Sequence, residues 1–142
     1  MTVHLKKLCV GISSLAELRE WRVRMAQKYG HDQPTIHTTR HMPKRAAELL
    51  DGGSLYWVIS GQIRCRQSIV ELRQLDGDEK GPKCAIVMAP ELVETRLQAH
   101  RPFQGWRYLP VDDAPADLKV GESNHDDLPP SLASELRTLG LI

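Results

Sequence analysis

The sequence has little of several features that usually identify the class of a protein. Of its 142 residues only three are Trp, three Tyr and one Phe, and its cysteines are also three, Cys9, Cys65 and Cys84. An odd number of widely spaced cysteines fits reduced thiols better than a disulfide framework or a Cys-x-x-Cys zinc site. No apolar run approaches the roughly 20 residues that span a bilayer, and the start lacks the pattern of a signal peptide. We therefore expect a cytoplasmic protein without a membrane segment.

Motifs for several common chemistries are also missing. The chain has no Walker loop, Gly-x-Ser-x-Gly elbow or Gly-x-Gly-x-x-Gly. His37 and His41 stand four residues apart, which on a helix would place both imidazoles on one face, as a zinc site needs. Their segment is typical of a strand and loop, where four residues span roughly 13 Å. We therefore expect neither a metal nor a cofactor.

Length and composition are those of one ordinary domain, with 41% hydrophobic and 26% charged residues. The net charge of +1 conceals an uneven distribution. Residues 1–110 contain 17 Lys and Arg against 11 Asp and Glu, whereas residues 111–142 contain 2 against 7. A basic body with an acidic tail indicates an anion-binding face, although the same distribution also serves solubility.

The first half of the chain predicts alternating strands and helices. A strand over 2–10 needs a bulge near Lys6 and Lys7, because its apolar residues change phase. Residues 14–28 predict a helix with a capping box and with Leu18 and Trp21 facing inward. The segment PTIHTTR is typical of a short strand. MPKRAAELLDGG is typical of a short helix that begins at Pro43.

The second half is typical of antiparallel strands. SLYWVIS and QIRCRQSIVELRQL predict a hairpin that turns at Ser60 and Gly61. In its second strand, period 2 predicts one face with Ile63, Cys65, Gln67 and Ile69 and the other with Arg64, Arg66 and Ser68. KCAIVMA and RPFQGWRYL predict two more strands, residues 110–130 a surface arm, and residues 131–140 a C-terminal helix. The expected fold is a single α+β domain with a mixed or mostly antiparallel sheet of about five strands, partly barrel-like, with packed helices.

Basic and aromatic residues form the candidate site. Arg40, His41, Lys44 and Arg45 stand where a strand meets a helix N-terminus, which itself attracts anions. One strand face adds two arginines, and RPFQGWRYL adds donors and a stacking ring. The predicted ligand-binding residues are Arg40, His41, Lys44, Arg45, Arg64, Arg66, Arg101, Phe103, Gln104 and Arg107. Trp106 is the better core candidate of its segment, because period 2 places it opposite both arginines.

HMPKRAAELLDGGSLYWVISGQIRCRQSI and RPFQGWRYLPVDDAPADL resemble the alphaproteobacterial family catalogued as domain of unknown function 1489. The similarity runs from the first strand to the final LRTLGLI. This resemblance implies no activity, and where the family typically has lysine after YWVI this chain has Ser60. The layout is also loosely similar to the small RNA-binding barrels of the pseudouridine-synthase-and-archaeosine-transglycosylase type, a likeness that concerns the fold alone.

Three functions are compatible with these residues. The first is a non-catalytic module that binds RNA or another phosphate-bearing ligand through the arginine and aromatic residues. The second is a small enzyme acting on an anionic metabolite, with His37 or His41 as general base and an arginine as anion clamp. The third is a protein-interaction subunit, since Trp, Tyr and Arg also anchor interfaces. The sequence leaves the oligomeric state undetermined.

Overall fold

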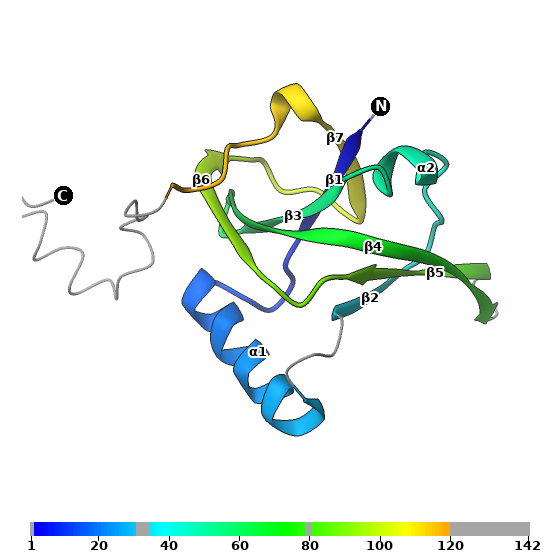
Figure 1. Ribbon diagram of the computed structural model, residues 1–142, viewed down its shortest axis with the longest axis horizontal. Helices are drawn as coiled ribbons and strands as arrows, with labels where there is room; N and C mark the ends of the chain where they lie inside the picture. Colours follow the sequence, from blue (N-terminus) through cyan, green and yellow to red (C-terminus); the bar gives the residue numbers. More distant parts are fainter. Residues whose placement is uncertain (1, 31–34, 79–80, 120–142) are drawn as a thin grey trace, which may run out of the picture.

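The computed structural model describes residues 2–30, 35–78 and 81–119, which form a mostly-sheet unit with few helices (Figure 1). The strands are β1 (Val3–Leu8), β2 (Thr35–Thr39), β3 (Ser54–Ile59), β4 (Gln62–Asp78), β5 (Gly81–Met88), β6 (Val93–Ala99) and β7 (Trp106–Pro110). The helices are α1 (Leu15–Tyr29), α2 (Ala46–Leu49) and the 3₁₀ turn η1 (Val111–Asp113).

The sheet is mixed and open. Its strands run in the order β2-β5-β4-β3-β1-β7, with β6 beside β4. Only β1 and β3 pair in parallel; the other described pairs are antiparallel. The long strand β4 pairs with β3 and β6 through its first half and with β5 through its second half. The expectation of about five strands partly closed into a barrel is therefore inexact, because there are seven and β2 and β7 stay unpaired with each other.

The hairpin between β3 and β4 confirms the predicted turn. Ser60 and Gly61 both have positive φ, 50° and 80°, which is the geometry that two-residue hairpin turns of type I′ require. The serine tolerates this conformation while its hydroxyl donates a hydrogen bond to the carbonyl of Ser13 at 2.7 Å. The turn thereby also ties the hairpin to the segment before α1.

A bulge in β4 corrects the predicted faces of that strand. Val58 pairs with Ile63 and Trp57 with Cys65, so Arg64 is the extra residue. The bulge turns Ile63 to the opposite side of the sheet from Cys65, where it packs in a different core cluster. The alternation of side chains between the two faces of the strand is regular before the extra residue and after it, but it does not continue across it. The bulge expected in the first strand is absent, since β1 pairs in continuous register with β3 and β7.

The first turn of α1 fixes the helix to the sheet. The Ser14 hydroxyl accepts a hydrogen bond from the amide of Glu17 at 3.1 Å, which confirms the predicted cap. Leu15 and Leu18 are buried, but Trp21 is 40% exposed, so its prediction as an inward core residue is wrong. The reason is visible in Figure 1, where α1 extends away from the sheet after its first turns.

The short helix begins later than predicted, and the described part of the predicted surface arm is mostly exposed. The short helix α2 begins at Ala46, with Arg45 as its N-cap, and not at Pro43. The first part of the expected surface arm lies along β6, where the amides of Arg96 and Leu118 donate to the carbonyls of Ala116 and Glu94. The rest of the arm, 120–130, and the predicted helix 131–140 lie outside the described residues.

The core occupies both faces of the sheet at its centre. Every residue of β3 is buried. One cluster packs between β1, β3, β4, β5 and α1, and a smaller one packs Tyr56, Val58, Ile63 and Leu109 on the other face. The free thiols Cys65 and Cys84 are buried and Cys9 is half-buried, and none of the three is in a disulfide. A sheet buried on both faces at its centre leaves its open edges as the places for a ligand.

Candidate anion-binding cavity

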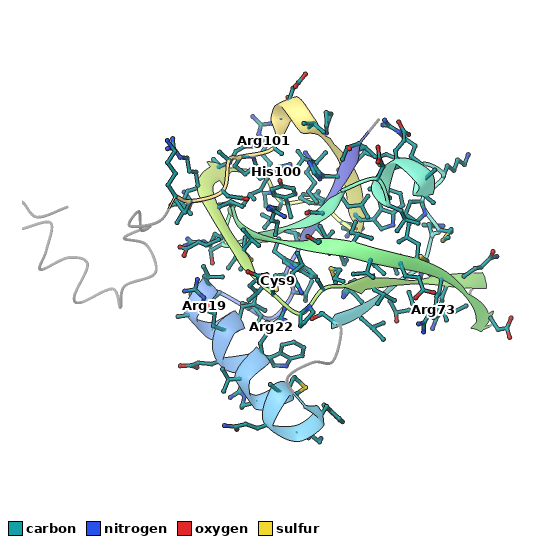
Figure 2. All side chains as sticks on the ribbon, viewed as in Figure 1. Cys9, Arg19, Arg22, Arg73, His100 and Arg101 are labelled. Carbon is teal, nitrogen blue, oxygen red and sulfur yellow. The ribbon has the colours of Figure 1, made fainter. Side chains whose placement is uncertain are left out.

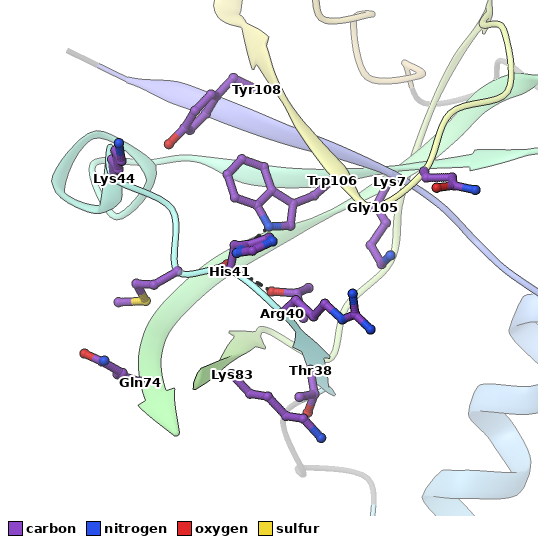
Figure 3. A pocket seen from close by; sticks show the side chains of 13 residues that line it. Lys7, Thr38, Arg40, His41, Lys44, Gln74, Lys83, Gly105, Trp106 and Tyr108 are labelled. Carbon is purple, nitrogen blue, oxygen red and sulfur yellow. Dashed lines mark hydrogen bonds between the residues drawn. The ribbon is translucent and has the colours of Figure 1, made fainter. Parts of the chain in front are cut away.

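An open cavity of about 880 Å³ lies between β1 and β7 on one side and β2 and the β4–β5 hairpin on the other (Figure 3). We call it the basic cavity. It is lined by Lys7, Thr38, Thr39, Arg40, His41, Met42, Lys44, Gln74, Lys83, Gln104, Gly105, Trp106 and Tyr108. Four segments far apart in the sequence therefore contribute to one surface.

The lining is strongly biased toward positive charge. Lys7, Arg40, Lys44 and Lys83 carry cationic groups and His41 adds an imidazole, whereas no Asp or Glu of the described part of the chain is among the lining residues. Burial is the main cause that lowers the pKa of Lys7, because the partly enclosed ammonium loses hydration. A cavity with cations and without carboxylates carries a positive potential that concentrates anions.

One wall of the basic cavity is aromatic. Trp106 and Tyr108 lie on the same side of β7 and meet edge to face, with ring centroids 5.0 Å apart. The indole N–H of Trp106 donates to the carbonyl of His41 at 3.3 Å, and the Tyr108 hydroxyl accepts from the amide of Arg45 at 3.1 Å. These two bonds fix the loop 40–45 against β7, so the wall and the basic loop hold a defined relative position.

The loop 40–45 only partly follows the predicted arrangement. Arg40, His41 and Lys44 line the cavity as a group, together with Gln104. Arg45 instead pairs with Glu48, at 2.5 and 2.9 Å, and its guanidinium lies 5.3 Å from the Tyr108 ring. The expected helix N-terminus does not supply an anion site, because α2 has four residues and the Arg45 amide already donates to Tyr108.

The two arginines of β4 that were predicted to bind the ligand, Arg64 and Arg66, lie outside the basic cavity and have partners within the chain. Arg64 is only 7% exposed, and its guanidinium donates to the carbonyl of Ile59 at 3.2 Å and to Gln62. Arg66 forms two bonds of 2.7 Å to the carboxylate of Asp117. These bonds hold the pKa of Asp117 below its usual range. Neither arginine lines the basic cavity, so the structure does not bring them together with the loop 40–45.

RPFQGWRYL is divided between two surfaces. Only Trp106–Pro110 is strand, and Arg101 lies outside it. The ring of Phe103 packs against His100, with centroids 4.7 Å apart, and the Arg107 guanidinium lies 5.7 Å from the same ring. Figure 2 labels His100 and Arg101 in its upper part, and neither these two residues nor Phe103 or Arg107 is among the lining residues of the cavity. Arg101, Phe103 and Arg107 thus lie outside the basic cavity, whereas Trp106 forms its wall.

Sequence reasoning missed Lys7, Gln74 and Lys83 as lining residues. For Lys7 a signal existed, because Val3 and Leu5 are buried and period 2 places Lys7 on their face. A lysine that continues an apolar face indicates a position near a cavity or an anion. Gln74 and Lys83 gave no such signal, since only the pairing of β4 with β5 brings them to the cavity.

Three general findings bear on the chemistry of the described residues. They contain no group of three or more His, Cys, Asp or Glu side chains that could hold a metal ion. No helix in the described part of the chain is long and apolar enough to cross a membrane. His37 lies outside the basic cavity and packs edge to face on Trp57, and burial lowers its pKa.

Comparison with known proteins gives one match. A family model described as Protein of unknown function (DUF1489) matches residues 5–142. No curated protein and no solved structure matches the chain.

Proposed function

The chain belongs to the DUF1489 family, whose function is unknown, and from its site we propose that it binds a nucleoside phosphate in the basic cavity. The ligand is either a free nucleotide or a nucleotide unit of single-stranded RNA. The phosphate would contact Arg40, Lys44 and Lys83, and the base would stack on the wall of Trp106 and Tyr108. The protein acts as a binding module in the cytoplasm of an alphaproteobacterium, where its three thiols stay reduced.

The observation that carries this proposal is the composition of one cavity. Four cationic side chains and two aromatic rings share a lining that contains no carboxylate. Lys and Arg bind phosphate oxygens through charge-assisted hydrogen bonds, and aromatic rings stack unpaired bases. A cavity of about 880 Å³ also falls in the size range of small-molecule sites.

Catalysis by a histidine base is less well supported. His41 lines the basic cavity, but no carboxylate among the lining residues is placed to orient its ring. The thiol of Cys9 is outside this cavity, and burial raises its pKa to about 11, so it is not a nucleophile near neutral pH. The described geometry therefore favours a binding role over a reaction.

The proposal is tested by calorimetric titration with AMP, a single-stranded RNA decamer and inorganic phosphate, at several salt concentrations. We expect AMP to bind more tightly than inorganic phosphate, because the base adds stacking. If RNA is the ligand, the decamer binds more tightly than AMP. The logarithm of its association constant then falls linearly with the logarithm of the salt concentration, with a slope of about −0.7 per phosphate contacted.

Matched variants locate the binding. Arg40→Gln with Lys44→Gln should lower AMP affinity by roughly a hundredfold, since each substitution removes a charge-assisted contact. Arg101→Gln with Arg107→Gln removes the same number of charges outside the cavity and should change affinity by less than about twofold. Equal losses in both double variants would show that only the net charge matters, and no binding of any probe would overturn the proposal.

A further inference from the structure

A second cavity, of about 400 Å³, lies between α1, the end of β1 and β2. It is lined mainly by apolar side chains, with Lys7 shared with the basic cavity. The apolar residues are Leu8, Val10, Ile12, Leu18, Trp21, Ile36 and Trp57. Figure 2 shows Arg22 of α1 and Cys9 labelled close together in this part of the molecule. We call this space the apolar cavity.

One residue that lines the apolar cavity, Arg22, carries a polar atom without a partner. The Nη1 atom of Arg22 is buried and has no hydrogen-bond partner among the described residues. The surroundings lower the pKa of this guanidinium through loss of hydration. A buried guanidinium N–H without an acceptor is unfavourable. An unsatisfied buried group in a native protein needs an explanation, and an acceptor bound beside the guanidinium would supply one.

The rim of the same cavity exposes large apolar side chains. Trp21 is 40% exposed, Ile36 54% and Val10 86%, and all three line the cavity. Scattered exposed apolar residues are ordinary, but several gathered around one cavity mark a ligand-binding site. Both the interior and the rim therefore favour an apolar ligand body.

The other polar side chains of the cavity limit the charge of the ligand. Among the described residues, no Asp or Glu lines the cavity. Burial raises the pKa of Cys9 to about 11 and lowers that of His37, so both groups are neutral near pH 7. The cations left in the lining are Arg22 and Lys7. An anion would meet attraction and no opposing carboxylate there.

We propose that the apolar cavity is a second ligand site, which binds a small amphipathic carboxylate. The carboxylate accepts a hydrogen bond from the guanidinium of Arg22, which lines the cavity, and its apolar body packs against Ile36, Trp21 and the neighbouring aliphatic residues. This site is distinct from the nucleoside phosphate site, although Lys7 lies between the two cavities.

The test uses decanoate and decan-1-ol, which share an apolar chain and differ in charge. Both are titrated below their aggregation limits into the full chain, and binding is followed by calorimetry. Decanoate should bind at least about tenfold more tightly than decan-1-ol, because only decanoate supplies the acceptor for Arg22. Equal affinity, or no binding of decanoate, would overturn the proposal.

Two variants and a matched control locate the contacts. Arg22→Gln should lower decanoate affinity at least about tenfold and leave decan-1-ol unchanged, whereas Arg24→Gln, on the exposed side of α1, should change neither. Ile36→Asn should weaken both ligands. Decanoate affinity that is insensitive to Arg22→Gln would contradict the assigned contact. AMP binding should persist in Arg22→Gln, so the failure of either site can be recognised separately.

Discussion

The centre of the sheet and its open edge both contain basic residues, but in opposite situations. At the centre, Arg64 and Arg66 donate to carbonyl, amide and carboxylate oxygens of the chain itself. At the open edge, the lining of the basic cavity collects four cations and no carboxylate. Basic residues therefore serve architecture in one region and line a cavity in the other. The difference lies in which acceptors the fold brings near, not in the sequence around each arginine.

The largest expected effect concerns the buried centre. Trp57→Ala should destabilise the protein by about 3–5 kcal/mol, because it removes a buried ring and leaves a cavity. The ring is 7% exposed, and its N–H donates to the side chain of Gln67 at 2.9 Å. Urea unfolding followed by circular dichroism measures this loss. A loss below about 1 kcal/mol would mean that this region is not the core.

A smaller effect is expected for the arginine that ties residues 111–119 to the sheet. Arg66→Ala should cost about 1–3 kcal/mol, since it removes two charge-assisted bonds to Asp117 and one to Ser54. Amide exchange at Arg96 and Leu118 should accelerate. Arg73→Ala is the control, because its pair with Glu71 is exposed and exposed ion pairs contribute little to stability. Equal losses in both variants would contradict a structural role specific to Arg66.

Acidification should weaken the sheet near β1. Burial lowers the pKa of His4 and His37 below 6.5, aided by Arg66 and Lys7 respectively. The unfolded chain then binds protons more readily, so stability falls as the pH drops below about 6.5. The Nδ1 of His4 accepts from the Ser54 amide at 2.9 Å, a bond that protonation at Nδ1 removes. Thermal melts from pH 7.5 to 5.5 should show a falling Tm, with a shallower slope in His4→Asn/His37→Phe.

The smallest expected effect on stability is at the open edge. Arg40→Gln with Lys44→Gln should change stability by no more than about 0.5 kcal/mol, because both residues are exposed. A slight gain is expected, since the substitutions relieve repulsion with Lys7 and Lys83. Chemical denaturation at low salt measures it. A loss above about 1 kcal/mol would place these cations in the architecture and remove the contrast with Arg64 and Arg66.

Local signals in the sequence predicted many elements correctly. The Ser14 cap, the Ser60–Gly61 turn and the strand over KCAIVMA are confirmed, because each depends on a few adjacent residues. The bulge at Arg64 was not predictable, because the partner strands determine where a residue is inserted. The exposure of Trp21 was missed because an apolar stripe does not reveal where the opposing sheet ends.

The candidate site was predicted only in part, because only some of its residues are close to one another in the sequence. The loop residues Arg40, His41 and Lys44 are close in sequence, and their grouping needed no knowledge of the fold. Arg66 and Arg107 looked equivalent to them in the sequence, but a long-range ion pair with Asp117 holds Arg66 elsewhere, and Arg107 lies over the ring of Phe103. Lys7 and Lys83 join the cavity only through strand pairing. The basic residues could be counted from the sequence, whereas the structure was needed to locate the hydrogen-bond acceptors near each of them.

One NMR titration tests the contrast between the two regions most directly. The indole N–H signals of Trp21, Trp57 and Trp106, assigned by Trp→Phe substitution, are followed as AMP is added to the ¹⁵N-labelled protein. Because Trp106 lines the basic cavity and Trp57 donates to buried Gln67, we expect AMP to shift the Trp106 signal in a saturable manner and leave the other two in place. Shifts confined to Trp57 or Trp21, or saturable AMP binding with an unmoved Trp106 signal, would contradict the assignment of the basic cavity as the ligand site.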